Sequence, residues 1–127
     1  MKTIENYKKT INIMYIEDDT LATSKLKNIL EKYYNKIIIA SNGEDAFKKM
    51  KNEPKIDLII SDINMPKMDG YEFLEELRKD NSNMPFVFVT ARDEPDKMLK
   101  AIQLDINNYI LKPINLQNLL SVIDKII

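Results

Sequence analysis

Short apolar segments alternate along the chain with longer segments that have helical spacing. The apolar segments are rich in Ile, Val, Phe and Tyr and are nearly continuous in apolarity, which is typical of strands buried on both faces. They cover residues 11–16, 36–40, 57–61, 85–89 and 108–111. The pattern therefore predicts five central strands.

The intervening segments carry apolar residues three or four positions apart, as amphipathic helices do. One such stripe consists of Ala22, Leu26, Ile29, Leu30 and Tyr33. The last helix is expected to begin near Ile114 and to carry Leu116, Leu119, Leu120, Ile123 and Ile127. Five strands that alternate with five helices imply an α/β fold with helices on both faces of a parallel sheet, because parallel strands need crossover connections.

Composition narrows the chemistry that is available. The chain has 127 residues, which fits one domain, and its net charge is −1 with lysines spread along its length, so neither a nucleic acid nor a membrane partner is expected. It contains no cysteine and no histidine. Any metal must then be held by oxygen atoms, which favours magnesium, calcium or manganese.

The apolar runs and the two ends of the chain indicate where the protein is located in the cell and how the domain is bounded. Runs such as residues 58–60 are far shorter than the roughly 20 residues that span a bilayer, and residues 1–6 have no apolar signal region, so we expect a cytoplasmic protein. Residues 1–10 are polar and predict an N-terminal arm before a domain of residues 11–127. The apolar end at Ile126 and Ile127 favours a domain of a longer protein over a complete single-domain protein, and both forms remain open.

Polar side chains follow four of the five predicted strands. They are Glu17, Asp18 and Asp19 after the first strand, Asp62 after the third, Thr90 after the fourth and Lys112 after the fifth. Because the carboxyl ends of parallel strands meet at one edge, these groups are expected to converge there. Each alone has an ordinary explanation, such as a helix cap, a turn or a surface amine.

Converging carboxylates need a cation. A like-charged pair about 4 Å apart costs on the order of 4 kcal/mol at an effective dielectric of about 20. Mg²⁺ fits such a cluster, since it takes one or two carboxylates and completes its shell with water or phosphate oxygens. A lysine at the same edge can pair with a carboxylate at rest and with a phosphoryl oxygen afterwards, and a threonine can donate to another of those oxygens.

Three stretches, residues 57–74, 89–91 and 109–113, carry a resemblance to a known family. They resemble the phosphoacceptor, switch-threonine and conserved-lysine segments of the receiver domain of two-component response regulators, and the resemblance covers about residues 10–127. It implies a flavodoxin-like, doubly wound (βα)5 fold with strand order 2-1-3-4-5. It also implies a signalling domain that promotes only its own phosphorylation and dephosphorylation.

The resemblance assigns roles around the acidic residues. Asp62 would be the phosphoacceptor, Asp18 and Asp62 would bind Mg²⁺ directly, Glu17 would act through water, and Asn64 would offer its backbone carbonyl. Asp19 lies one place beyond the usual acidic pair and is expected to be a loop or capping residue.

The remaining roles concern the phosphoryl group and the switch. Thr90 and Lys112 would bind phosphoryl oxygens, with the bond from Lys112 to Pro113 in the cis form. Tyr109 would be a rotameric switch that turns inward when Thr90 moves toward the phosphoryl group. Arg92 would flank the route of the attacking water.

The partners implied are a sensor histidine kinase or phosphotransfer protein upstream, and an effector protein or fused output domain downstream. The face formed by the fourth helix, the fifth strand and the fifth helix, with Met98 turned outward, would pass on the signal to a partner or to a second copy in a phosphorylation-dependent dimer. One departure is Asp105-Ile106, where the family commonly has Gly-Ala.

Two other classes of protein share parts of this pattern. A Mg²⁺-dependent phosphohydrolase with an aspartate nucleophile commonly places a second aspartate two residues later as a general acid, where this chain has Asn64. A flavin-binding module would need a loop rich in Ser, Thr or Gly after the first strand. The carboxylates of Glu17, Asp18 and Asp19 would repel a phosphate at that position.

Overall fold

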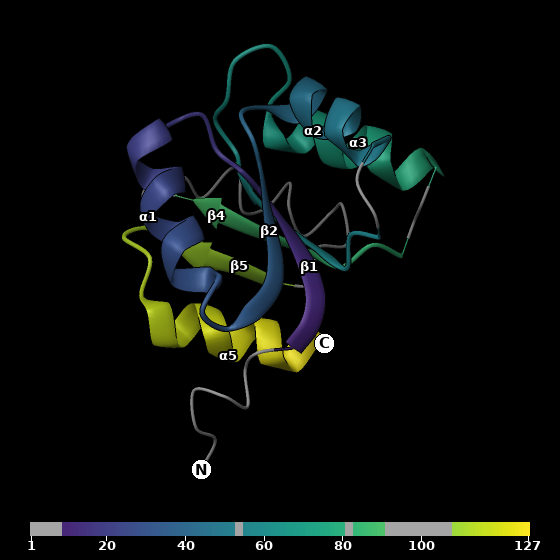
Figure 1. The fold of residues 1–127 in the computed structure, drawn as a ribbon. Coiled ribbons are helices and arrows are strands. Elements are labelled where there is room, and N and C mark those ends of the chain that lie inside the picture. The colour runs from purple at the N-terminus through teal and green to yellow at the C-terminus, as the bar shows by residue number, and fades with distance from the viewer. Residues whose placement is uncertain (1–8, 53–54, 81–82, 91–107) are drawn as a thin grey trace.

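The computed structural model describes residues 9–52, 55–80, 83–90 and 108–127, and these residues form five strands and four helices (Figure 1). The strands are β1 (Lys9–Ile16), β2 (Tyr34–Ala40), β3 (Leu58–Asp62), β4 (Phe86–Thr90) and β5 (Asn108–Leu111). The helices are α1 (Thr20–Leu30), α2 (Gly43–Met50), α3 (Gly70–Asp80) and α5 (Leu116–Ile126). The expected fourth helix, Arg92, Met98 and Asp105-Ile106 lie outside the described residues.

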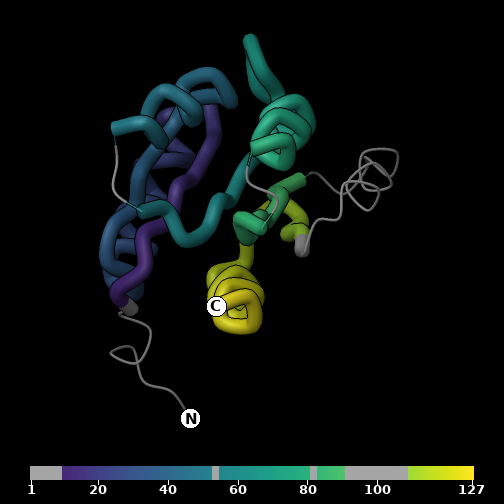
Figure 2. The backbone as a smooth tube through the Cα atoms, turned by 90° about the vertical axis from the view of Figure 1, so that its right-hand side faces the viewer, coloured from purple at the N-terminus to yellow at the C-terminus, as the bar shows by residue number. Residues whose placement is uncertain are grey.

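All neighbouring strands pair in parallel, in the order β2-β1-β3-β4-β5. Helices α1 and α5 pack on one face of this sheet, and α2 and α3 pack on the other (Figure 1). Figure 2, turned by 90°, shows α3 and α5 on opposite sides of the strands. The expected flavodoxin-like, doubly wound fold is therefore confirmed.

The core consists of two apolar layers, one on each face of the sheet. Strand β4 shows why its sequence is continuously apolar, since Phe86 and Phe88 belong to the layer under α2 and α3 while Val87 and Val89 belong to the layer under α1 and α5. Successive side chains of a strand point to opposite faces, so a strand covered on both faces must be apolar at every position.

Each described helix begins with an Asp or Asn side chain that accepts backbone N–H groups. Asp19 Oδ1 accepts from Leu21 at 3.0 Å and from Ala22 at 3.2 Å, so Asp19 is the capping residue that was expected. Asp69 and Glu72 each accept the other's backbone N–H at the start of α3, which is a capping box.

Some boundaries differ from those the apolar pattern predicted. Helix α5 begins at Leu116 rather than near Ile114, because the Asn115 side chain accepts the N–H of Asn118 and caps the helix there. Strand β1 begins at Lys9, two residues before the predicted start. Asp62 is the last residue of β3, not the first after it, because it still pairs with Val89 of β4.

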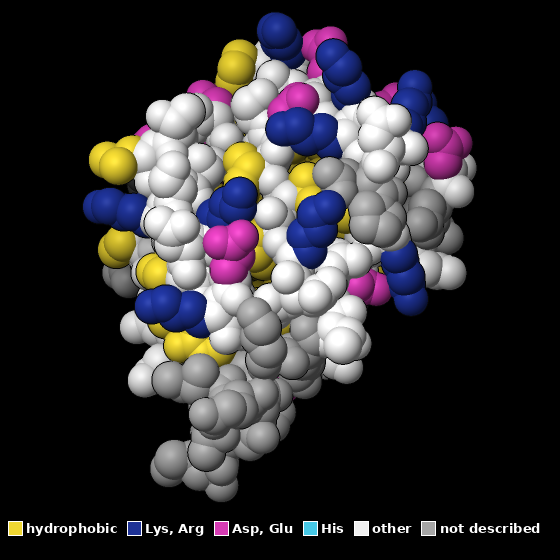
Figure 3. All heavy atoms as spheres, in the orientation of Figure 1, with side chains coloured by type: hydrophobic (Ala, Val, Ile, Leu, Met, Phe, Trp, Pro, Cys, Tyr) yellow, Lys and Arg dark blue, Asp and Glu magenta, His cyan; other side chains and the backbone are white. Residues whose placement is uncertain are grey.

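The described surface carries mixed charge. On the face drawn in Figure 3, Lys and Arg side chains are spread over the surface with Asp and Glu side chains among them. None of the described helices combines the length and apolarity that a membrane span requires.

Gly70 joins the start of α3 to the backbone that carries Asp62. The Gly70 N–H donates to the Ile63 carbonyl at 2.8 Å. A Cβ at this position would collide with the Asp62 carbonyl oxygen and would lie 3.0 Å from the Phe88 ring. The absence of a side chain at Gly70 therefore allows α3 to pack directly behind Asp62.

We expect Gly70→Ala to lower the free energy of unfolding by about 1–3 kcal/mol, the usual range for forcing an extra methyl group into a packed site. Urea denaturation of the two proteins measures this difference. Ser24→Ala on the exposed side of α1 is the control and should change stability by less than about 0.5 kcal/mol. Equal stabilities of Gly70→Ala and the original chain would show that α3 can move away from the Asp62 backbone without cost.

Candidate functional site

The strand register brings the predicted polar residues to one edge of the sheet. Ile16 of β1 pairs with Ser61 of β3, so the next residues, Glu17 and Asp62, lie side by side. On the far side of β3, Thr90 of β4 pairs with Leu111 of β5, so Lys112 follows at the same edge. The Lys112 N–H donates to the Thr90 carbonyl at 2.8 Å, which ties the two strand ends together.

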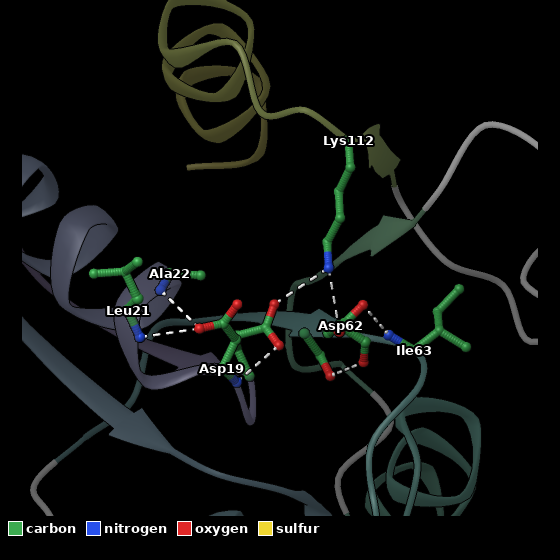
Figure 4. Close-up of polar contacts among 8 residues, drawn as sticks. Asp19, Leu21, Ala22, Asp62, Ile63 and Lys112 are labelled. Carbon is green, nitrogen blue, oxygen red and sulfur yellow. Dashed lines mark hydrogen bonds and ion pairs between the residues drawn. The ribbon is translucent and has the colours of Figure 1, made fainter.

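Lys112 bridges the two buried carboxylates. Its Nζ lies 3.3 Å from Glu17 Oε1 and 3.3 Å from Asp62 Oδ2. Figure 4 shows the Lys112 side chain extending from the end of β5 toward Asp62. Glu17 is 4% exposed and Asp62 7% exposed, so their charges are largely removed from water.

The second oxygen of each carboxylate accepts a backbone N–H. Glu17 Oε2 accepts from Asp19 at 3.2 Å, and Asp62 Oδ1 accepts from Ile63 at 2.9 Å. Each carboxylate is therefore held between a backbone donor on one oxygen and the Lys112 ammonium on the other. Both anions are fixed in orientation, and they share a single positive charge.

An acidic cluster at this edge could hold a metal ion. Glu17, Asp18 and Asp62 each offer a carboxylate oxygen, and these oxygens lie within 4.8 Å of one another. Asp18 is exposed, so water can reach the cluster from its side. A donor set made only of oxygens, open to water, fits a hard divalent cation such as Mg²⁺.

The crowding of charge affects the protonation of both partners. Burial raises the pKa of Glu17, and the neighbouring charge of Asp62 raises it further. Burial alone would lower the pKa of Lys112, but the charges of Asp62 and Glu17 outweigh this effect and raise it. The ammonium of Lys112 therefore stays protonated at neutral pH.

The other predicted residues occupy positions around this cluster. Thr90 is buried at the end of β4, and Asn64 is exposed in the loop that follows β3. Tyr109 is 39% exposed on β5, where it pairs with Phe88 in register. The bond from Lys112 to Pro113 is cis, as expected. The functional roles of Thr90, Asn64 and Tyr109 stay predictions.

One residue of the site was not identified from the sequence. Tyr15 is 1% exposed and lines a cavity of about 310 Å³ together with Glu17 and Lys112. Burial raises the pKa of the Tyr15 hydroxyl, and the charges of Glu17 and Asp62 raise it further. The available signal was its position two residues before Glu17 in a strand, which places both side chains on one face.

The chain belongs to the response regulator receiver domain family, whose model matches residues 13–124. It is thus a receiver domain of a two-component response regulator, a class of signalling domain that interacts with histidine kinases and output domains. A phosphoacceptor function is consistent with this membership, and the phosphohydrolase alternative is not favoured.

Relatives of known sequence and structure agree with this assignment. The chain is 34% identical over 115 residues to the sensory transduction protein BceR of Halalkalibacterium halodurans, covering 91% of this chain and 49% of that protein. It is 35% identical over 101 residues to the alkaline phosphatase synthesis transcriptional regulatory protein PhoP of Bacillus subtilis. This match covers 80% of this chain and 42% of that protein. The chain spans about half the length of the curated relatives it matches.

Solved receiver domains superpose over nearly the whole chain. The CheY-like receiver domain protein from Methanospirillum hungatei matches with a TM-score of 0.82 and 30% identity, covering 91% of this chain and 92% of that one. The receiver protein from Pseudomonas putida matches with a TM-score of 0.85 at 19% identity, covering 91% of this chain and 97% of that one. This likeness supports the fold alone.

We expect Glu17→Gln to stabilise the metal-free domain increasingly as the pH rises. Because the pKa of Glu17 is raised in the folded state, the folded protein holds this proton more tightly than the unfolded chain does. The favourable contribution of this proton is present below the ordinary pKa and is lost as the pH rises through the folded value. Lys112 keeps Asp62 as its partner in the variant.

Urea denaturation in EDTA at about pH 4 and about pH 8 measures the effect. The lower of these pH values lies near the ordinary pKa of a carboxyl group, and the higher lies well above it. The stability of Glu17→Gln relative to the original chain should be higher at the upper pH. The exposed Glu44→Gln is the matched control, because it removes one carboxylate at a surface position outside the site. A stability difference independent of pH would contradict the raised pKa of Glu17.

Proposed function

We propose that Asp62 accepts a phosphoryl group in a Mg²⁺-dependent reaction and that this modification switches the domain. The observation that supports the proposal is the pairing of Lys112 with both Asp62 and Glu17 at the carboxyl edge of the sheet. A lysine shared between two carboxylates can turn toward a phosphoryl oxygen on Asp62, while the Asp19 N–H still donates to Glu17. The family to which the chain belongs is consistent with a phosphoacceptor role.

In this proposal the metal ion is held by carboxylate and carbonyl oxygens. Asp18 and Asp62 would be direct ligands, Glu17 would act through water, and Asn64 would contribute its backbone carbonyl. The acidic cluster supports the first three, because its oxygens lie within 4.8 Å of one another. Bound Mg²⁺ would supply positive charge for the carboxylates and for an oxygen of the incoming phosphoryl group.

Side chains of the domain carry out the phosphoryl transfer and bind the transferred group. The Asp62 carboxylate forms the new bond to phosphorus while the bond from phosphorus to the donor nitrogen or oxygen breaks, and the leaving group keeps that electron pair. The Asp62 side chain is already oriented by the N–H of Ile63. Lys112 and Thr90 then bind oxygens of the phosphoryl group, and Tyr109 turns inward as Thr90 moves.

The donor in this proposal is a sensor histidine kinase or a phosphotransfer protein in the cytoplasm. The recipient is an effector protein or an output domain in the same polypeptide, reached through the face that includes β5 and α5, with phosphorylation-dependent self-association as one form of output. The domain promotes only its own phosphorylation and dephosphorylation and has no nucleic acid or membrane ligand of its own. Asn64 supports this against the phosphohydrolase alternative, because an amide cannot act as a general acid.

We expect Mg²⁺ to stabilise the folded domain by relieving the repulsion among Glu17, Asp18 and Asp62. At a free concentration 100 times its dissociation constant, a ligand of the folded state adds about 2.7 kcal/mol. The melting temperature with and without Mg²⁺ measures this, and Asp18→Asn should lose most of the increase. A melting temperature that does not respond to Mg²⁺ in the original chain would remove the metal from the proposal.

We expect acetyl phosphate with Mg²⁺ to add one phosphoryl group to the original chain and none to Asp62→Asn, because the amide is not a nucleophile for phosphorus. Intact-mass analysis detects the adduct. The exposed Asp80→Asn serves as the matched control and should be phosphorylated as the original chain is. An adduct that persists in Asp62→Asn would show that another residue is the acceptor.

A further inference from the structure

Tyr15 is a buried tyrosine whose polar end reaches the acidic edge. It lies on β1 two residues before Glu17, so both side chains point to the same face of the sheet. Its ring belongs to the core layer under α1 and α5, together with Leu26 and Leu119. Ile13, two residues earlier on the same face, belongs to the same core layer and has an aliphatic side chain. Packing alone therefore does not require a hydroxyl at Tyr15.

Two neighbouring cavities meet at Tyr15. The cavity of about 310 Å³ at the acidic edge is lined by Tyr15, Glu17, Asp19, Ala22, Lys112, Pro113 and Ile114. A second cavity of about 240 Å³ is mainly apolar and runs between α1 and the start of α5, with Leu26, Ile29 and Leu116 in its wall. Tyr15, Ala22 and Ile114 line both cavities. The phenol of Tyr15 therefore borders both the apolar cavity and the cavity that contains Glu17.

Tyr15 and Glu17 line the same cavity at the acidic edge, so the phenol lies beside the Glu17 side chain. Burial and the surrounding carboxylates raise the pKa of the Tyr15 hydroxyl, so it stays protonated and is able to donate to a carboxylate. A buried hydroxyl without a partner is costly, and the cavity that Tyr15 lines contains Glu17, the anion that also binds Lys112. Glu17 is held by the Asp19 N–H and the Lys112 ammonium, and the Tyr15 hydroxyl is placed to act as a third donor.

We propose that Tyr15 is a positioning residue that holds the Glu17 carboxylate in the orientation needed for Mg²⁺ binding. Glutamate has one more rotatable bond than aspartate, so its carboxylate loses more freedom when a metal site forms. A hydroxyl fixed in the core removes part of that freedom in advance, which is how preorganisation increases affinity. This inference rests on the proposed function, because it concerns the same metal site.

The test is Tyr15→Phe, which keeps the ring and removes only the hydroxyl. We expect the dissociation constant for Mg²⁺, measured by calorimetry, to rise about three- to tenfold, the effect of losing one hydrogen bond of ordinary strength. Tyr34→Phe is the matched control, since Tyr34 is fully buried in the same core layer but lies at the start of β2, at the opposite end of the sheet. Its dissociation constant should stay within about twofold of the original value.

Two further measurements separate positioning from a general loss of structure. In the metal-free protein, the ¹³C resonance of the Glu17 side-chain carboxyl should shift in Tyr15→Phe and not in Tyr34→Phe. In a Glu17→Ala background, adding Tyr15→Phe should leave the Mg²⁺ dissociation constant unchanged, because the acceptor is already absent. Circular dichroism confirms that each variant is folded before it is compared.

Each outcome of these experiments supports or contradicts the positioning role of Tyr15. An unchanged dissociation constant in Tyr15→Phe, or an unshifted Glu17 carboxyl resonance, overturns the positioning role while leaving the proposed function intact. An equal loss of affinity in the Glu17→Ala background also overturns it, because the effect would then bypass Glu17. Absence of Mg²⁺ binding by the original chain would overturn the proposed metal site and this inference together.

Discussion

Two buried carboxylates, Glu17 and Asp62, share the single ammonium of Lys112, and the arrangement of the sheet edge depends on this shared charge. Each lies 3.3 Å from Lys112 Nζ, and each has its other oxygen on a backbone N–H. One lysine compensates one of the two charges, and Asp18 adds a third carboxylate nearby. Burial and the charge of Asp62 raise the pKa of Glu17, and the residual negative charge makes the cluster suited to a divalent cation.

The same sharing gives the proposed switch a physical basis. A phosphoryl group on Asp62 adds negative charge at the place where Lys112 already divides its attraction. Lys112 would then favour the phosphoryl oxygens over Glu17, and the link from the Lys112 N–H to the Thr90 carbonyl keeps the end of β4 close to that change. In the proposed switch, a modification at Asp62 would therefore bias the strand that carries Tyr109, as a shift between existing conformations.

The fold and the main candidates could be predicted because simple rules of parallel sheets apply to this sequence. Continuous apolar segments marked the strands, and the rule that functional groups gather at their carboxyl ends selected Glu17, Asp62 and Lys112, which the structure brings together. Asp19 was expected to be a loop or capping residue because it lies one place beyond the usual acidic pair, and it caps α1.

Other features depend on three-dimensional contacts that periodicity does not contain. In the sequence, Tyr15 could not be distinguished from the other apolar residues of its strand. Its separation of two residues from Glu17 indicates a shared face of the sheet, but it does not show that both side chains line one cavity. Helix α5 starts at Leu116 because of the Asn115 cap, although the apolar stripe alone allowed an earlier start at Ile114. Asp62 is the last residue of β3 that pairs with β4, and only its register with Val89 shows this.

A structure of the domain bound to Mg²⁺ and beryllofluoride tests the central claim most directly, because this ligand imitates the phosphoryl group on Asp62. The account predicts that Lys112 Nζ lies about 3 Å from a fluoride, at hydrogen-bond distance, and no longer contacts Glu17. Beryllofluoride bound at Asp62 with Lys112 still bridging Glu17 and Asp62 would show that the shared ammonium does not respond to phosphorylation and would contradict the account.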